Sequence, residues 1–141
     1  MQNLKIGMGN SNYYENIETD STASAKQKLQ KGNYLDSFIN LQLDYDTRNQ
    51  KFQTTEGLRS QYYLDLPIIS ETSTLSNTYS LKRYSELFEN NISSISLYLK
   101  ASNSLKNEDI KLSERILLPS SRLRGFERGK IGPKDGDDFI G

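Results

Sequence analysis

The 141-residue sequence contains no cysteine, no histidine and no tryptophan. The absence of cysteine excludes disulfides and thiol chemistry and leaves the redox compartment open. Without histidine or cysteine side chains, the usual zinc, haem, Cys–His and Ser–His sites cannot be built. Sites of these types are therefore not expected in this chain.

Long apolar runs and an excess of charge are also missing. Apolar residues make up 34% of the chain, and 18 basic residues balance 18 acidic ones. Zero net charge gives no electrostatic reason to expect a nucleic acid partner. No stretch approaches the roughly 20 consecutive apolar residues of a spanning helix, but a spanning strand needs only about 9–11 residues. The composition therefore fits a polar all-β soluble domain or part of a membrane barrel.

Alternation of apolar and polar residues is the main signal in the chain. A period of two indicates a strand with one apolar and one polar face. About five such strands are predicted, most of roughly eight to twelve residues, and they suit an antiparallel meander. Their apolar residues fall within Leu4–Met8, Ile39–Tyr45, Leu58–Leu66, Leu75–Leu81 and Ile95–Ala101.

Polar stretches separate the predicted strands. Asn10 to Asn33 is long and poor in apolar residues, and we expect a mobile loop that contains at most a short helical turn. Pro67 removes a backbone donor and is expected to help end its strand. Turns are expected at Asp46–Gly57, Ser70–Ser73 and Glu86–Asn91.

The predicted polar faces carry charged residues, such as Asp44, Arg59 and Lys100. A sandwich could expose such a face to water and cover the apolar face with a second sheet. A barrel in lipid would instead turn the charged face toward a wet lumen. The long strands, and aromatic residues near strand ends that would form interfacial girdles, favour the barrel: Tyr34, Phe38, Tyr45, Tyr84 and Tyr98.

The segment near the carboxyl end is the most distinctive part of the sequence. Leu118-Pro119-Ser120-Ser121 leads into Leu123-Arg124-Gly125-Phe126, and Ile131-Gly132-Pro133 follows. Gly125 permits a conformation or a close approach that other residues do not. Arg124 and Phe126 are suited to fold back onto other structure, because the ring buries area while the guanidinium binds a carboxylate.

These motifs together resemble the sixth extracellular loop of the bacterial surface antigen superfamily of outer-membrane barrels, and within it the assembly-factor branch, BamA. The resemblance implies an all-β, sixteen-stranded transmembrane barrel preceded by POTRA domains. It implies that the motif loop folds into the lumen, where Arg124 contacts a carboxylate of a later strand. Gly125 would allow the close approach, Phe126 would pack, and Ile131, Gly132 and Pro133 would shape the returning limb.

The same resemblance implies a function without bond-making chemistry and without nucleotide, metal or other cofactor: folding other β-barrel proteins and inserting them into the outer membrane of a Gram-negative-type bacterium. We therefore expect that the protein is not an enzyme. The expected partners are the lipid bilayer, unfolded β-barrel clients and, through regions outside this chain, assembly-complex lipoproteins. Residues 1–141 would form about five of the sixteen strands and the motif loop, without POTRA domains or the C-terminal strands.

Two other functions fit the sequence. One is a two-partner-secretion-type exporter of the same superfamily, and the other is a soluble β-rich binding module. Remaining signals are weaker. The basic residues around Phe126 precede Asp135, Asp137 and Asp138, which cancel much of their field, and this acidic stretch lacks the spacing of a calcium loop. Asp44 and Asp46 on one strand face are more simply a hydrated surface than an acid–base pair.

Overall fold

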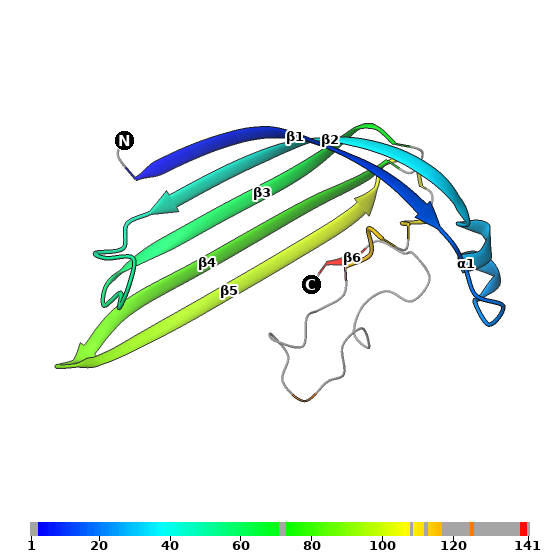
Figure 1. Ribbon diagram of the computed structural model, residues 1–141. Coiled ribbons are helices and arrows are strands. Elements are labelled where there is room, and N and C mark those ends of the chain that lie inside the picture. The colour runs from blue at the N-terminus through cyan, green and yellow to red at the C-terminus, as the bar shows by residue number, and fades with distance from the viewer. Residues whose placement is uncertain are drawn as a thin grey trace.

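The computed structural model describes residues 3–70, 73–107, 109–111, 113–116, 125 and 139–140. These residues form one antiparallel sheet in which every strand pairs with the next along the chain (Figure 1). Five long strands and one short helix precede a two-residue strand. Their bounds are β1 Leu4–Ile17, α1 Ala25–Leu29, β2 Gly32–Asp46, β3 Gly57–Ile69, β4 Thr74–Phe88, β5 Asn91–Ser104 and β6 Phe139–Ile140. The predicted all-β antiparallel meander is confirmed.

The strands are longer than the apolar alternation indicates, at 13 to 15 residues each. The largest difference lies in Asn10–Ile17, where a loop is predicted but β1 continues, with Tyr14 opposite Leu35 and Ile17 opposite Gly32. The prediction is wrong here because the ladder satisfies the backbone whether or not the side chains are apolar. The expected helical turn is present as α1, which Ser24 caps through a capping box with Gln27.

Two of the expected strand ends also lie elsewhere. Pro67 does not end β3, which continues to Ile69. Pro67 lies opposite Phe38, where the register between β2 and β3 shifts, and such irregularities tolerate a missing donor. The turn expected at Glu86–Asn91 is tighter, because β4 continues to Phe88 and Asn90 takes a positive φ of 62°. The loop before Gly57 is where it was predicted.

Strand register separates the side chains into two faces. The first, which we call the convex face, carries rows of apolar residues, and many of them are exposed: Ile6 is 73% exposed and Met8 is 80% exposed. The middle row of this face runs across all five long strands. It contains Ile6, Leu43, Tyr62, Tyr79 and Leu99. Within the described residues, no second sheet covers these side chains.

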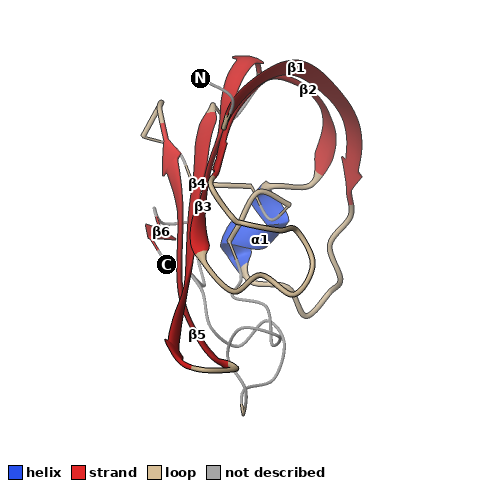
Figure 2. Cartoon of the chain, turned by 90° about the vertical axis from the view of Figure 1, so that its left-hand side faces the viewer, coloured by secondary structure: helices blue, strands red, loops and turns tan. Residues whose placement is uncertain are grey.

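The opposite, concave face carries the polar and charged residues. Figure 2 shows β1 and β2 curving around the side on which α1 lies. Buried polar side chains outnumber buried apolar ones among the described residues, where only Ile17, Ile110 and Ile116 are buried apolar residues. This distribution is the reverse of a soluble core and is typical of a barrel wall that meets lipid outside and water inside.

The aromatic residues near strand ends do not all form girdles. Register places Tyr34, Phe38, Tyr84 and Tyr98 on the concave face, and only Tyr45 of that set lies on the convex face. Tyr34 and Tyr84 instead pack against lysine ammonium groups. The predicted placement in interfacial girdles is therefore wrong for four of these five residues. Within the described part of the chain, no helix is long and apolar enough to cross a membrane.

Candidate functional site

Most of the predicted motif loop lies outside the described residues. This applies to Leu123, Arg124, Phe126, Ile131, Gly132 and Pro133. Gly125 is described and has a positive φ of 94°, which a glycine adopts without steric cost. No described atom lies within 4 Å of the position that a Cβ would take there. The positive φ explains why a glycine occupies position 125. The close approach of Gly125 to another segment stays a prediction.

The segment that leads toward the motif packs against the concave face through residues 109–111 and 113–116. Its central residue is Lys111, which has no exposed surface. The Lys111 ammonium forms an ion pair with Asp36 of β2 and lies 4.6 Å from the centre of the Tyr34 ring. A carboxylate of the same segment, Glu114, lies 3.7 Å from the ammonium. Lys111 therefore replaces its lost hydration with a carboxylate and an aromatic face.

Asp36 is the point at which three parts of the chain meet. Its side chain is buried in β2, with 3% of the residue exposed. One carboxylate oxygen accepts a hydrogen bond of 2.7 Å from the Ser70 hydroxyl at the end of β3, and the other binds Lys111. Both carboxylate oxygens therefore have donors that replace the water lost on burial.

Backbone and apolar contacts fix the rest of the segment. Ile110 and Ile116 are buried, with 1% and 4% of each residue exposed. The Ile110 carbonyl accepts hydrogen bonds from Gln30 at 3.4 Å and from Arg115 at 3.2 Å. The Ser113 hydroxyl donates to Glu15 of β1 at 2.7 Å. The segment is thus attached to β1, to β2 and to the residue after α1.

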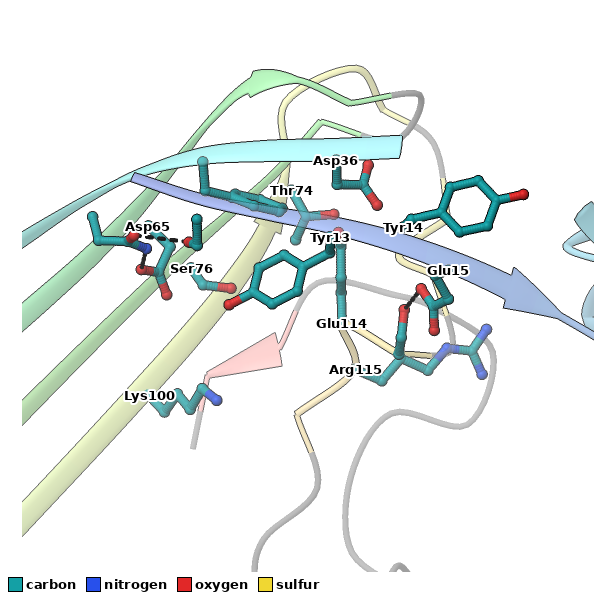
Figure 3. Close-up of a pocket in the computed structure, with 14 residues that line it drawn as sticks. Tyr13, Tyr14, Glu15, Asp36, Asp65, Thr74, Ser76, Lys100, Glu114 and Arg115 are labelled. Carbon is teal, nitrogen blue, oxygen red and sulfur yellow. Dashed lines mark hydrogen bonds between the residues drawn. The ribbon is translucent and has the colours of Figure 1, made fainter. Parts of the chain in front are cut away.

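A cavity of about 550 Å³ lies between this segment and the concave face. Figure 3 shows Tyr13 and Glu15 of β1, Asp65 of β3 and Lys100 of β5 around it, with Glu114 and Arg115 closing one side. Its wall mixes an aromatic pair with charged groups. The rings of Tyr13 and Phe38 meet edge to face at 6.1 Å, and Asn40 donates to Asp65 at 2.6 Å.

Among the carboxylates that line the cavity, Glu114 lies outside the strands and has a shifted pKa. Burial raises the pKa of the Glu114 carboxyl above its usual value, and the negative charges of Asp36 and Glu15 add to the effect. The Thr74 hydroxyl and the Lys111 ammonium oppose that rise in pKa. Although the cavity is rich in acidic groups, no three of them within the described ranges come together as a metal site.

A second charged cluster lies on the concave face near the other end of the strands. Arg59 binds both oxygens of Asp44, at 3.1 and 2.8 Å. Arg48 does the same with Asp46, at 2.9 and 2.7 Å. Bidentate pairing satisfies both carboxylates. The pairs agree with the interpretation of Asp44 and Asp46 as parts of a hydrated wall.

The packed segment is the part of the site that the sequence analysis missed. Alternation of apolar and polar residues fades after Asn103, so the sequence pattern predicts no structure there. The available signal was the pair Ile110 and Ile116 in polar surroundings, with a lysine beside the first. Its partner Asp36 lies 75 residues earlier, in a stretch without a strand pattern. The contact between the two side chains can therefore be recognised only in the folded structure.

Comparison with known proteins gives two matches to the whole or most of the chain. The Omp85 superfamily domain matches residues 2–141. A SAM50-like protein from Schizosaccharomyces pombe is 30% identical over 128 residues, which are 84% of this chain and 26% of that protein. The chain thus spans about a quarter of the length of this relative. No solved structure matches the chain.

Proposed function

Because this chain belongs to the Omp85 superfamily, we propose that the protein of which it forms part folds other β-barrel proteins and inserts them into an outer membrane. The superfamily is one of membrane-embedded barrels, and the similarity to a SAM50-like protein supports the assembly role. The proposed partners are the lipid bilayer and unfolded β-barrel clients, with assembly-complex lipoproteins reached through other regions of the protein. Non-covalent folding of clients needs no enzyme chemistry.

The observation that carries this proposal is the distribution of polarity on one curved sheet. The convex face is apolar and uncovered, while a segment of the same chain is ion-paired onto the concave face through Lys111 and Asp36. A wall that faces lipid on one side and holds its own loop on the other suits a barrel with a partly filled lumen. A partly filled lumen would hinder the diffusion of solutes through the barrel, so the strands themselves would act on client proteins.

Within this proposal, Arg124 has a structural role. It would lock the motif loop to a carboxylate of a later strand, while Gly125 and Phe126 shape and pack the loop. The Lys111–Asp36 pair would hold the lead-in limb of the same loop. We propose a Gram-negative-type outer membrane as the location. The SAM50-like relative comes from a eukaryote, so a eukaryotic membrane is the alternative.

Export of a partner protein is the second candidate function, because the concave face is charged and hydrated. Paired arginines and aspartates, with Lys82 and Lys100 on the same face, would also suit the wall of a pore. Export and assembly differ in their product, since an exporter releases a soluble protein and an assembly factor leaves a barrel in the membrane.

The test uses the full-length gene in cells depleted of the native copy. Arg124→Ala is expected to lower the amount of heat-modifiable client barrels in the outer membrane several-fold. Arg128→Ala, a matched change four residues away, is expected to leave it unchanged. Loss of one secreted protein with normal client barrels would instead support export. Equal client levels in both variants and the wild type would contradict the role of Arg124.

A further inference from the structure

The convex face of the five long strands carries a single charged side chain. Strand register assigns the residues of β1 to β5 to one face or the other, and on the convex face every position but one is apolar, aromatic or an uncharged polar residue. The exception is Arg83 of β4, which lies between Leu58 of β3 and Ile95 of β5. It is exposed, and none of the ion pairs among the described residues includes it.

Arg83 lies at the edge of the band of apolar residues that crosses the convex face. Its row is two rows from the middle row that contains Tyr79. At about 7 Å per pair of residues and a tilt of about 40°, the Cα of Arg83 lies about 10 Å from the middle of the band along the membrane normal. An arginine there can extend its guanidinium to the level of the lipid phosphates while its stem remains among acyl chains.

A groove beside Arg83 contains charges of the opposite sign. Its volume is about 440 Å³, and Glu56, Leu58, Arg83 and Glu86 are among the residues that line it. The groove lies where β4 continues past its last pair with β3, Gly57 opposite Tyr84. Neither glutamate lies within ion-pair distance of Arg83. By register Glu86 belongs to the concave face, and it lines the groove from the part of β4 that extends past β3. It accepts a hydrogen bond of 3.1 Å from the Asn90 backbone N–H, which holds it beside the turn.

We propose that this groove binds the headgroup of a zwitterionic phospholipid that carries an amine, with Arg83 on the phosphate and Glu56 and Glu86 near the ammonium. A guanidinium binds phosphate oxygens in a bidentate manner, and two carboxylates complement a cation a few ångströms away. Leu58 and Ile95, which flank Arg83, contact the upper acyl chains. The two carboxylates disfavour a headgroup of net negative charge. The inference needs only that the convex face meets lipid, and it is independent of client insertion.

The experiment measures lipid retention by the full-length protein. The detergent-solubilised barrel is mixed with phosphatidylethanolamine or phosphatidylglycerol of identical acyl chains, and bound lipids are counted by native mass spectrometry. Wild-type protein is expected to retain phosphatidylethanolamine in preference to phosphatidylglycerol. Arg83→Gln is expected to lower phosphatidylethanolamine retention about five- to tenfold, because a charge-assisted bidentate contact is lost.

Lys82→Gln is the matched control, because the adjacent residue loses the same charge on the concave face. Its lipid retention is expected to equal that of the wild type. Arg83→Lys keeps the charge without the bidentate geometry, so we expect an intermediate value. Heat-modifiable migration on gels verifies that each variant is folded. Equal retention by the Arg83→Gln and Lys82→Gln variants would overturn the proposal. Tighter binding of phosphatidylglycerol by the wild type would also overturn it.

Discussion

Lys111 places a positive charge where no water reaches it, and its contacts decide what a substitution there does. Asp36 supplies the opposite charge, and Tyr34 covers the ammonium with its ring. Removal of one partner of a buried pair leaves the other charge uncompensated, which commonly costs about 3–5 kcal/mol. Lys111→Met in the full-length protein is therefore expected to release the segment 109–116, measured as a loss of amide hydrogen-exchange protection there.

Two further variants test whether the buried charge is the cause. The double change Lys111→Met with Asp36→Leu removes both charges and should restore much of the protection. Lys26 also pairs with a carboxylate, Asp109, but at 3.7 Å and with more than half of the Lys26 side chain exposed. Lys26→Met should have little effect because exposed pairs contribute little to stability. Similar losses in the Lys26→Met and Lys111→Met single variants would contradict a special role for Lys111.

Glu114 gives the packed segment a dependence on pH. Burial is the main reason that its pKa in the folded protein is raised above the unfolded value. A raised carboxyl pKa means that the folded state holds its proton more tightly, so the contribution of Glu114 to stability falls as pH rises from the unfolded pKa to the folded pKa. Protection of residues 109–116 should therefore be greater just below this window than above it.

Glu114→Gln tests the sign of that effect. Glutamine has nearly the same shape but no charge to desolvate, so the variant should be at least as well protected as the wild type at pH 7.5. It should also lose the Glu114 component of the pH dependence. Protection factors from hydrogen exchange at pH 5 and pH 7.5, corrected for the intrinsic rates, measure both effects. A variant whose segment is less protected at pH 7.5 would show that the contact with Lys111 outweighs desolvation.

At the scale of elements, the loop between β2 and β3 depends on Gly57. This residue has a φ of 102°, and a Cβ would lie 2.4 Å from the Thr47 carbonyl oxygen and 2.7 Å from the Arg48 Cα. Both contacts are with backbone, so a side-chain rotation cannot relieve them. The strained φ alone costs on the order of 1–3 kcal/mol. We therefore expect Gly57→Ala to lower the melting temperature of the full-length barrel by several degrees.

Gly9→Ala is the control for this prediction. Gly9 lies in β1 with an ordinary φ, and the nearest atom to its added Cβ is the end of the Asn40 side chain, at 3.9 Å. Alanine at this position should change the melting temperature little. Thermal unfolding followed by gel mobility compares the two variants directly. Equal stability of the Gly9→Ala and Gly57→Ala variants would show that the loop can shift to accept a Cβ.

Strand register explains which elements the sequence could reveal. The run from Ile39 to Tyr45 is predicted because each second residue faces lipid and must be apolar. Residues 10–17 escape the prediction because this part of β1 has polar residues on both faces, so only its pairing with β2 identifies it. The predicted motif residues other than Gly125 lie outside the described ranges. The Lys111–Asp36 pair could not be predicted either, because the two residues are 75 positions apart and meet only when the segment after β5 packs on the concave face.

On the scale of the whole molecule, the connections fall at two ends of the sheet. The loop that contains α1, the end of β3 and the segment after β5 lie at one end, where Gln30 and Ser70 contact the residues around Lys111. The loop 47–56 and the tight turn at Glu89 and Asn90 lie at the other (Figure 1). If the motif loop is extracellular, the first end lies outside the membrane and the second end lies in the periplasm.

Single cysteines in the full-length protein test this orientation, and this chain contributes no background because it has no cysteine. Ser21 lies in the loop before α1 and Glu89 in the β4–β5 turn, and both are exposed. We expect an impermeant maleimide to label Ser21→Cys in intact cells, because its thiol lies outside. Glu89→Cys should react only after the membrane is opened, because the apolar convex face fixes the sheet across the bilayer. Labelling of Glu89→Cys alone in intact cells would reverse the orientation. Labelling of both variants would contradict a sheet that spans the membrane.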